Sequence, residues 1–185
     1  MKNNKLLFRL FILLAIIQLA APLSMIWRYE DILHTGKQYN WVTAPIDPYD
    51  ALRGRYVDLR FKEMKGPILG KIQLKYGQTA YAIISEDSNG YAFIRGISDS
   101  QPEGEKNSYI KIRVTHVQDG NIAHVQLPFE RYYMQEDLAS EAERAYSKSA
   151  GKEAVVSVRF KDGYGVVEQL YIGDKTIYEY LRTSD

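Results

Sequence analysis

Acidic and basic side chains gather between residues 44 and 61, in the stretch APIDPYDALRGRYVDLRF. Asp47 and Asp50 lie three residues apart, and Arg53 follows three residues later. Carboxylates placed this closely could serve as a general acid or base. The same spacing also fits a capped turn, because Asp47 precedes Pro48 and the carboxylate of Asp50 can reach back to the cap.

The residues that come after the charged cluster have the pattern of a strand. Gly54 is placed to end the turn in the left-handed conformation that only glycine adopts cheaply. Val57, Leu59 and Phe61 then occupy alternate positions, as a strand with one face on the core requires. Local structure therefore explains the cluster without any catalysis.

Two hydrolytic alternatives remain open. The segment RGRYVDLRF resembles the strand that opens the catalytic domain of signal peptidase-like proteases, in which a lysine activates a serine outside the membrane. Ser24 would be the nucleophile here, with Lys71 or Lys75 as its base. Glu130 and Glu136 could in principle flank a glycosidic bond as a carboxylate pair. Either arrangement would make the protein an envelope hydrolase.

A histidine metal site is not expected. The chain has no cysteine and three histidines. In YIKIRVTHVQDGNIAHVQL, a two-residue turn at Asp119-Gly120 would pair residue 114 with residue 125. That register places His116 on the core side and His124 on the opposite face, so the two cannot share an ion. The third, His34, lies outside the hairpin, and the sequence predicts no metal and no cofactor.

Composition excludes one class of partner. The 185 residues include 25% charged positions with a net charge of +1, and no run of Lys and Arg forms a basic patch. Nucleic acid is therefore not an expected partner. The 15 tyrosines suit half-buried sheet positions, where the ring packs and the hydroxyl stays wet. A tyrosine-lined groove for carbohydrate or peptide is the alternative interpretation.

One segment has the composition of a membrane span. Residues 10–27 are apolar except for Gln18 and Ser24, and as a helix they would reach about 27 Å, close to the bilayer core of roughly 30 Å. Lys2, Lys5 and Arg9 precede the run, and this charge distribution predicts that the amino terminus lies in the cytoplasm. A cleaved signal peptide is the alternative, which Pro22 disfavours.

The rest of the chain is predicted to be mainly β, in an α+β arrangement. Four turn dipeptides separate apolar or alternating runs: Asn89-Gly90, Asp119-Gly120, Asp162-Gly163 and Gly173-Asp174. The one convincing helix is EDLASEAERAYSKSAG, with Asp137 as its expected cap and Gly151 at its end.

These elements divide the chain into expected parts. Residues 1–9 are cytoplasmic, residues 10–27 form the anchor, and residues 28–43 form a stalk. Two small β-rich lobes come next, over residues 44–105 and 106–185, separated by the packing-poor stretch SDSQPEGEKNS.

The charged cluster resembles the signature of the GDYXXLXY proteins, membrane-anchored bacterial proteins with a D-P-x-D-x-x-R-G-D-Y lead-in. The matching positions are Asp47, Pro48, Asp50, Arg53, Gly54, Tyr56 and Leu59. Arg55 replaces the aspartate of the motif and Phe61 replaces its last tyrosine. A permanent cation at residue 55 would abolish any acid chemistry there, which favours a structural role for that position.

A second block, FERYYMQEDLASEAERA, resembles the later segment of the same family, an aromatic strand followed by an acidic helix. Arg131, Tyr132 and Glu136 match its pattern. The resemblance covers nearly the whole chain. It implies a single-pass protein anchored in a bacterial inner membrane, with its body outside the cytoplasm, and it implies no enzyme class.

We therefore expect a non-catalytic module that works with a membrane or envelope partner, an integral membrane protein among the candidates. Arg53, Tyr56, Arg131, Tyr132 and Glu136 are the polar residues expected either to orient a ligand in a cleft or to lock the lobes together. Side chains that converge on an open cleft would favour binding, whereas buried internal pairs would favour architecture.

Overall fold

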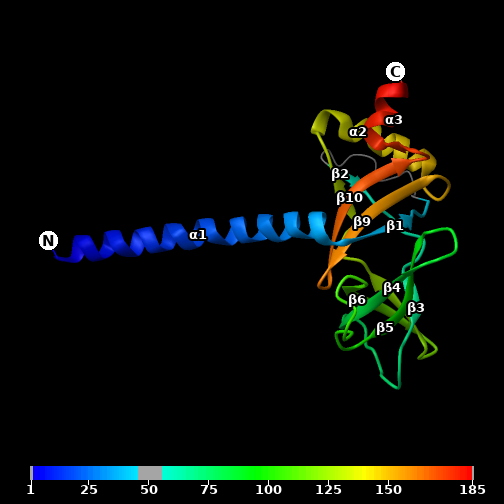
Figure 1. Ribbon diagram of the computed structural model, residues 1–185, viewed down its shortest axis with the longest axis horizontal. Helices are drawn as coiled ribbons and strands as arrows, with labels where there is room; N and C mark the ends of the chain where they lie inside the picture. Colours follow the sequence, from blue (N-terminus) through cyan, green and yellow to red (C-terminus); the bar gives the residue numbers. More distant parts are fainter. Residues whose placement is uncertain (1, 46–55, 185) are drawn as a thin grey trace.

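The computed structural model describes residues 2–45 and 56–184. A long helix projects from a body that extends across the helix axis (Figure 1). The elements follow in this order: α1 (Lys2–Thr35), β1 (Lys37–Val42), β2 (Tyr56–Asp58), β3 (Lys65–Pro67), β4 (Thr79–Glu86), β5 (Ala92–Ser98), β6 (Tyr109–Gln118), β7 (Ile122–Gln126), β8 (Arg131–Tyr133), α2 (Glu136–Ser149), β9 (Ala154–Lys161), β10 (Tyr164–Ile172), β11 (Lys175–Thr176) and α3 (Ile177–Ser184).

The helix α1 contains the expected apolar run. Its stretch from Lys5 to Thr35 is long and apolar enough to cross a membrane, a test of length and composition that a signal sequence also passes. The helix continues past the end of the run to Thr35, without a break at Pro22.

The strands form three sheets, so the mainly β class is confirmed. Their orders are β1-β9-β10-β11, β2-β8 and β3-β7-β6-β4-β5. All four predicted turn dipeptides join neighbouring strands. At two of these turns both residues have positive φ, Asp119 with Gly120 and Asp162 with Gly163, as tight hairpins of the I′ kind require.

The prediction that residues 28–43 form a stalk is wrong. Residues 28–35 complete α1, and β1 pairs with β9 along its whole length, from Lys37 opposite Phe160 to Val42 opposite Val155. Tyr39 and Trp41 alternate into the core, with 1% and 0% exposure. Every second residue of this short segment is therefore buried, which is the pattern of a strand with one face on the core.

The sheets also do not follow the expected boundary at residue 105. β6 and β7 pair with β3 and β4 from before it, while β1 pairs with β9 from after it. The stretch between β5 and β6 is a loop within one sheet rather than a linker between lobes. An aromatic cluster joins the parts of the core, with Trp41 edge-on to Phe61, Phe129 and Phe160 at 5.8 to 6.3 Å between ring centroids.

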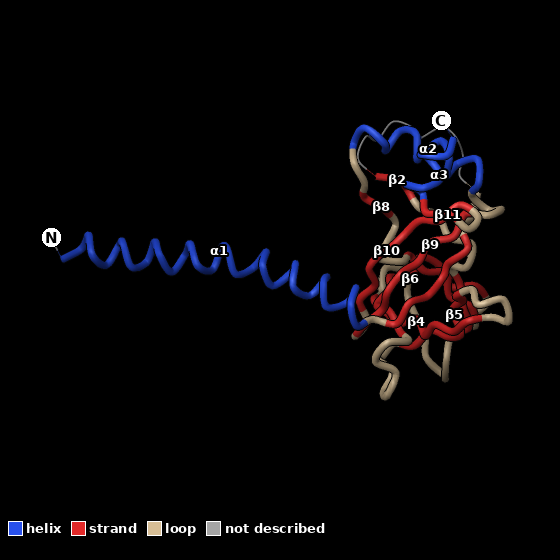
Figure 2. Tube along the Cα trace, turned by 45° about the horizontal axis from the view of Figure 1, so that its top comes forward, coloured by secondary structure: helices blue, strands red, loops and turns tan. Residues whose placement is uncertain are grey.

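The predicted helix forms as α2, and a second short helix, α3, was not predicted. Figure 2 shows the two together at one end of the body. Gln135 rather than Asp137 stands at the cap of α2 and makes no side-chain capping bond, so that expectation is wrong. Gly151 follows the helix with φ of +77°, as the predicted end requires.

Candidate functional site

The small sheet of β2 and β8 brings the two motif segments together. Tyr56 lies opposite Tyr133, Val57 opposite Tyr132, and Asp58 opposite Arg131. Val57 and Leu59 are buried at 0% and 1% exposure, because alternate residues of the strand face the core. Direct strand pairing therefore joins two motif segments that lie far apart in the sequence.

The exposed face of this sheet carries a stack of one cation and two aromatic rings. The Arg131 guanidinium lies over the Tyr56 ring, 4.5 Å from its centroid. Tyr56 meets the Tyr133 ring edge-on at 5.8 Å. Hydrogen bonding to the Tyr133 phenol, and then the nearby Tyr56, raise the pKa of Arg131. The stack holds a permanent positive charge on the surface beside two phenols.

The other face of the sheet is architectural. Tyr132 is 7% exposed, and burial raises its pKa to about 12. Its ring belongs to the same core cluster as Leu59. Glu136, a short distance beyond β8, begins α2.

The helix α2 holds the motif strand through two polar contacts that the sequence did not reveal. The Arg60 backbone N–H donates to the Tyr146 hydroxyl at 3.1 Å, and burial raises the pKa of Tyr146 to about 12. The Asp58 N–H donates to a Glu143 carboxylate oxygen at 3.3 Å, and burial raises the pKa of Glu143. The helical period predicts that Tyr146 is buried, but nothing in the sequence names its partner.

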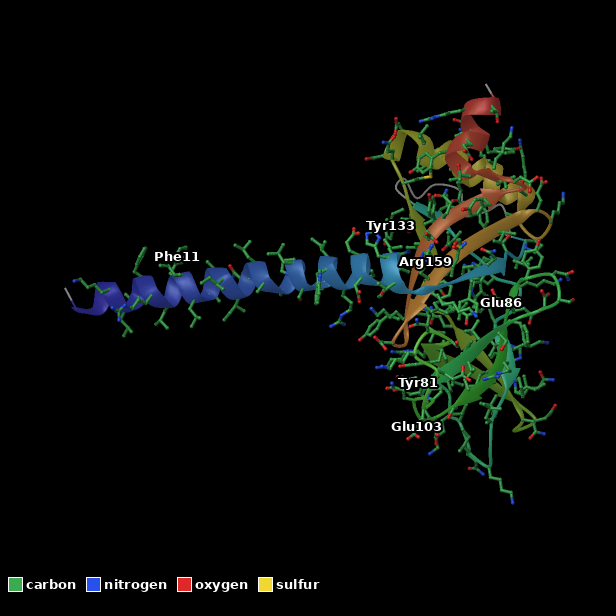
Figure 3. All side chains as sticks on the ribbon, viewed as in Figure 1. Phe11, Tyr81, Glu86, Glu103, Tyr133 and Arg159 are labelled. Carbon is green, nitrogen blue, oxygen red and sulfur yellow. The ribbon has the colours of Figure 1, made fainter. Side chains whose placement is uncertain are left out.

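A cleft of about 930 Å³ opens beside the stack. Its walls come from β6, β8, β10 and the loop before β8, and Tyr29 of α1 also lines it. The lining residues include the following tyrosines and charged side chains: Tyr29, Lys111, Arg113, Glu130, Arg131, Tyr132, Tyr133 and Glu168. Tyr133 lies on the side of the body from which α1 projects (Figure 3).

The charges of the cleft are unevenly compensated. Glu168 pairs with Arg159, with 2.9 Å between Nε and Oε1, and Glu130 accepts a hydrogen bond from Gln126 at 3.3 Å. Lys111 and Arg113 are exposed, and neither has an ion-pair partner among the described residues. The sequence reasoning missed both, although their alternation with Ile110, Ile112 and Val114 marks them as the outer face of one strand.

The sequence matches the model of the GDYXXLXY protein family over residues 18–170, which run from α1 into β10. The chain belongs to the GDYXXLXY family. No curated protein and no solved structure shows a significant match to it.

The GDYXXLXY motif residues divide between two roles in this structure. Tyr56 and Arg131 lie in the exposed stack, whereas Leu59 and Tyr132 lie in the core. Phe61, which departs from the tyrosine of the motif, is 3% exposed and packs edge-on against Trp41, so its site has no need of a hydroxyl. Asp47, Asp50, Arg53 and Gly54, together with the turn expected around them, lie outside the described residues.

Ser24 of this GDYXXLXY protein lines a smaller cavity of about 300 Å³, between α1 and the β9–β10 turn. The lysine that shares this cavity is Lys161, rather than Lys71 or Lys75. The Lys161 ammonium lies 2.7 Å from an Asp31 carboxylate oxygen. The Ser24 hydroxyl donates to the Ala21 carbonyl at 2.7 Å, a bond within the helix.

The predicted pairing of His116 is wrong, because β6 contains a β-bulge. Val114 pairs with Val125 as predicted, but a shift before His116 places that residue opposite His124, with 5.6 Å between ring centroids. The bulge adds a residue to β6 and reverses the facing of the residues beyond it. Within residues 2–45 and 56–184, no group of three or more His, Cys, Asp or Glu side chains could hold a metal ion.

Proposed function

We propose that this GDYXXLXY protein is a membrane-anchored, extracytoplasmic binding module without catalysis of its own, which engages a membrane or envelope partner in the cleft beside β8. The observation that carries the proposal is the stack of Arg131 on Tyr56 at the wall of that cleft, at 4.5 Å. An exposed guanidinium with fixed orientation suits recognition of a carboxylate or phosphate.

In this proposal, α1 is a transmembrane helix that is not cleaved and that anchors the protein. Its apolar run matches the bilayer core in length. Lys2, Lys5 and Arg9 lie before the run, while Glu30 and Asp31 come soon after it. The positive-inside rule then keeps the amino terminus in the cytoplasm and sends the body across the inner membrane.

The placement of the acidic residues favours binding over hydrolysis. A carboxylate pair that acts on a glycosidic bond must flank that bond from both sides, so both groups must reach the cleft that holds the sugar. Glu130 lines the cleft beside β8, whereas Glu136, at the start of α2, is not among its lining residues.

The test places a photoreactive benzoylphenylalanine at Gln126, an exposed residue of the cleft, in the full chain in native membranes. We expect one adduct of defined mass. Arg131→Ala and Tyr56→Ala should remove it, because each breaks the stack. Arg95→Ala is the matched control, since it also removes an exposed arginine from a strand: Arg95 lies on β5 and pairs with Glu105. Equal adduct yields from all four proteins would refute the proposal.

The same membranes test the hydrolase alternative, which rests on Ser24 and Lys161 lining one cavity. A fluorophosphonate probe should leave the chain unlabelled if the Ser24 hydroxyl stays bonded to the Ala21 carbonyl. Labelling that disappears in Ser24→Ala would favour the hydrolase instead.

A further inference from the structure

The end of α1 is docked onto the body. Ile32 is 2% exposed, and the Lys161 ammonium lies 2.7 Å from the Asp31 carboxylate. One turn earlier, the Arg28 guanidinium lies over the Tyr164 ring, 5.1 Å from its centroid. These contacts come from both sides of the β9–β10 turn, so the helix sets the height of the body above any membrane that it spans.

That height places the cleft in the headgroup layer. The apolar run ends at Trp27, and Tyr29 lies two residues further on, about 3 Å along the helix axis. The headgroup layer adds roughly 5 to 7 Å on each side of the hydrocarbon core. Tyr29 therefore sits within that layer, and it lines the cleft. Tyr133 lies on the same side of the body as the helix (Figure 3).

The charge of the cleft suits an anion. Three cations line it, Lys111, Arg113 and Arg131. Glu168, one of its two carboxylates, pairs with Arg159. Glu130 keeps its charge while it accepts a hydrogen bond from Gln126, so the three cations outnumber the one carboxylate that has no cationic partner among the described residues. Lys111 and Arg113 lie two residues apart on one face of β6, a spacing of about 7 Å along the strand.

The geometry points to the headgroup of an anionic phospholipid, from the same membrane that α1 spans, as the occupant of the cleft. This inference rests on the proposed function, which puts the cleft beside a membrane, and it names the class of partner. The phosphate lies between the cations of β6 and Arg131, while the phenol of Tyr133 supplies a further donor. A lipid is favoured over a polypeptide because the cleft opens where headgroups are always present.

The experiment uses the full chain in nanodiscs of phosphatidylcholine, with or without phosphatidylglycerol. Native mass spectrometry counts the phosphatidylglycerol that stays bound after gentle removal of the disc, and hydrogen exchange follows β6 and β8. We expect bound phosphatidylglycerol, and slower exchange of both strands only when that lipid is present.

Lys111→Gln with Arg113→Gln should reduce retention about thirtyfold, because each basic residue at an anionic surface contributes roughly fivefold. Each single change should reduce it about fivefold. The matched control is Lys62→Gln with Lys152→Gln, which removes the same charge from a different groove of about 600 Å³. The control should retain the lipid as the unaltered chain does.

Equal retention of both lipids by the unaltered chain, or equal losses in the cleft and control variants, would overturn the headgroup assignment. If a protein adduct at Gln126 then still depended on Arg131, the occupant would be a polypeptide and the proposed function would stand. If no adduct depended on Arg131, the proposed function would fail as well.

Discussion

Replacing Tyr146 with phenylalanine tests how α2 holds the motif strand. Tyr146 is fully buried, and its hydroxyl accepts the hydrogen bond of the Arg60 N–H at 3.1 Å. Tyr146→Phe keeps the ring, so no cavity forms, but it leaves that N–H without its acceptor. This contact is part-buried, so water can partly replace the lost acceptor, and a hydrogen bond of this kind contributes about 0.5–1.5 kcal/mol. The free energy of unfolding should fall by this amount near neutral pH.

The same substitution should reduce the alkaline sensitivity of the fold. Burial raises the pKa of Tyr146 from 10.0 to about 12. Above the lower value the unfolded chain loses the phenolic proton while the folded chain keeps it, so the free energy of unfolding falls as pH rises between the two. At about pH 11 this amounts to about 1.4 kcal/mol for one such group. Tyr132, with a similar shift, contributes the same way and stays in the variant.

Urea unfolding of the full chain in detergent measures both effects. Trp41, at 0% exposure, reports on the core, and Trp27→Phe removes the other tryptophan from both proteins. The variant should be less stable near neutral pH and lose less stability than the unaltered chain towards about pH 11. Equal stabilities near neutral pH would refute the hydrogen-bond argument, and equal losses in alkali would refute the burial argument.

Two further substitutions test other contacts of the fold. Glu143→Gln should stabilise the body near neutral pH by less than about 1 kcal/mol after solvent screening. Burial raises the pKa of Glu143, so near neutral pH its negative charge opposes folding. In the variant, the amide oxygen of the glutamine still accepts the hydrogen bond from the Asp58 N–H. The gain in stability, measured by urea unfolding, should vanish below the ordinary glutamate pKa of 4.5, where the carboxyl group is neutral in both states. Gly36→Ala should loosen the junction of α1, because a Cβ there would lie 2.5 Å from the Ile32 carbonyl oxygen and 3.0 Å from that of Phe160. Hydrogen exchange at the end of α1 should then accelerate, and unchanged exchange would contradict the prediction.

The features that the sequence predicted are those set by neighbouring residues. Turn dipeptides fix their own backbone conformation, and all four formed hairpin turns. The length of the apolar run identified α1, and the periodicity of the chain identified α2 and the buried positions Val57, Leu59 and Phe61. Local geometry and the burial of one face suffice for these assignments.

The features that were missed depend on segments far apart in the chain. The pairing of β1 with β9 removes the expected stalk, and the pairing of β3 with β7 crosses the expected boundary. One extra residue before His116 inverted the predicted facing of His116 and brought it to the face of His124. No periodicity reports which strand is a partner or where a bulge falls, because both depend on packing in the folded body.

The site was found only in part for the same reason. Arg131 and Tyr56 were singled out from the motif, whereas Lys111 and Arg113 come from a strand outside it and reach the cleft only through the fold. Successive residues of a strand face opposite sides of its sheet. The paired strands β2 and β8 therefore send Val57 into the core and Tyr56, Arg131 and Tyr133 to the opposite face, beside the cleft.

This division determines what a substitution in the motif can test. Changes at Leu59 or Tyr132 remove buried contacts, so they measure the stability of the body before they measure anything about a partner. Changes at Tyr56 or Arg131 disturb an exposed cation–aromatic pair, which contributes only about 0.5–1 kcal/mol to folding. A loss of binding in an Arg131 variant that remains folded is therefore attributable to the cleft, and the same loss in a Tyr132 variant is not.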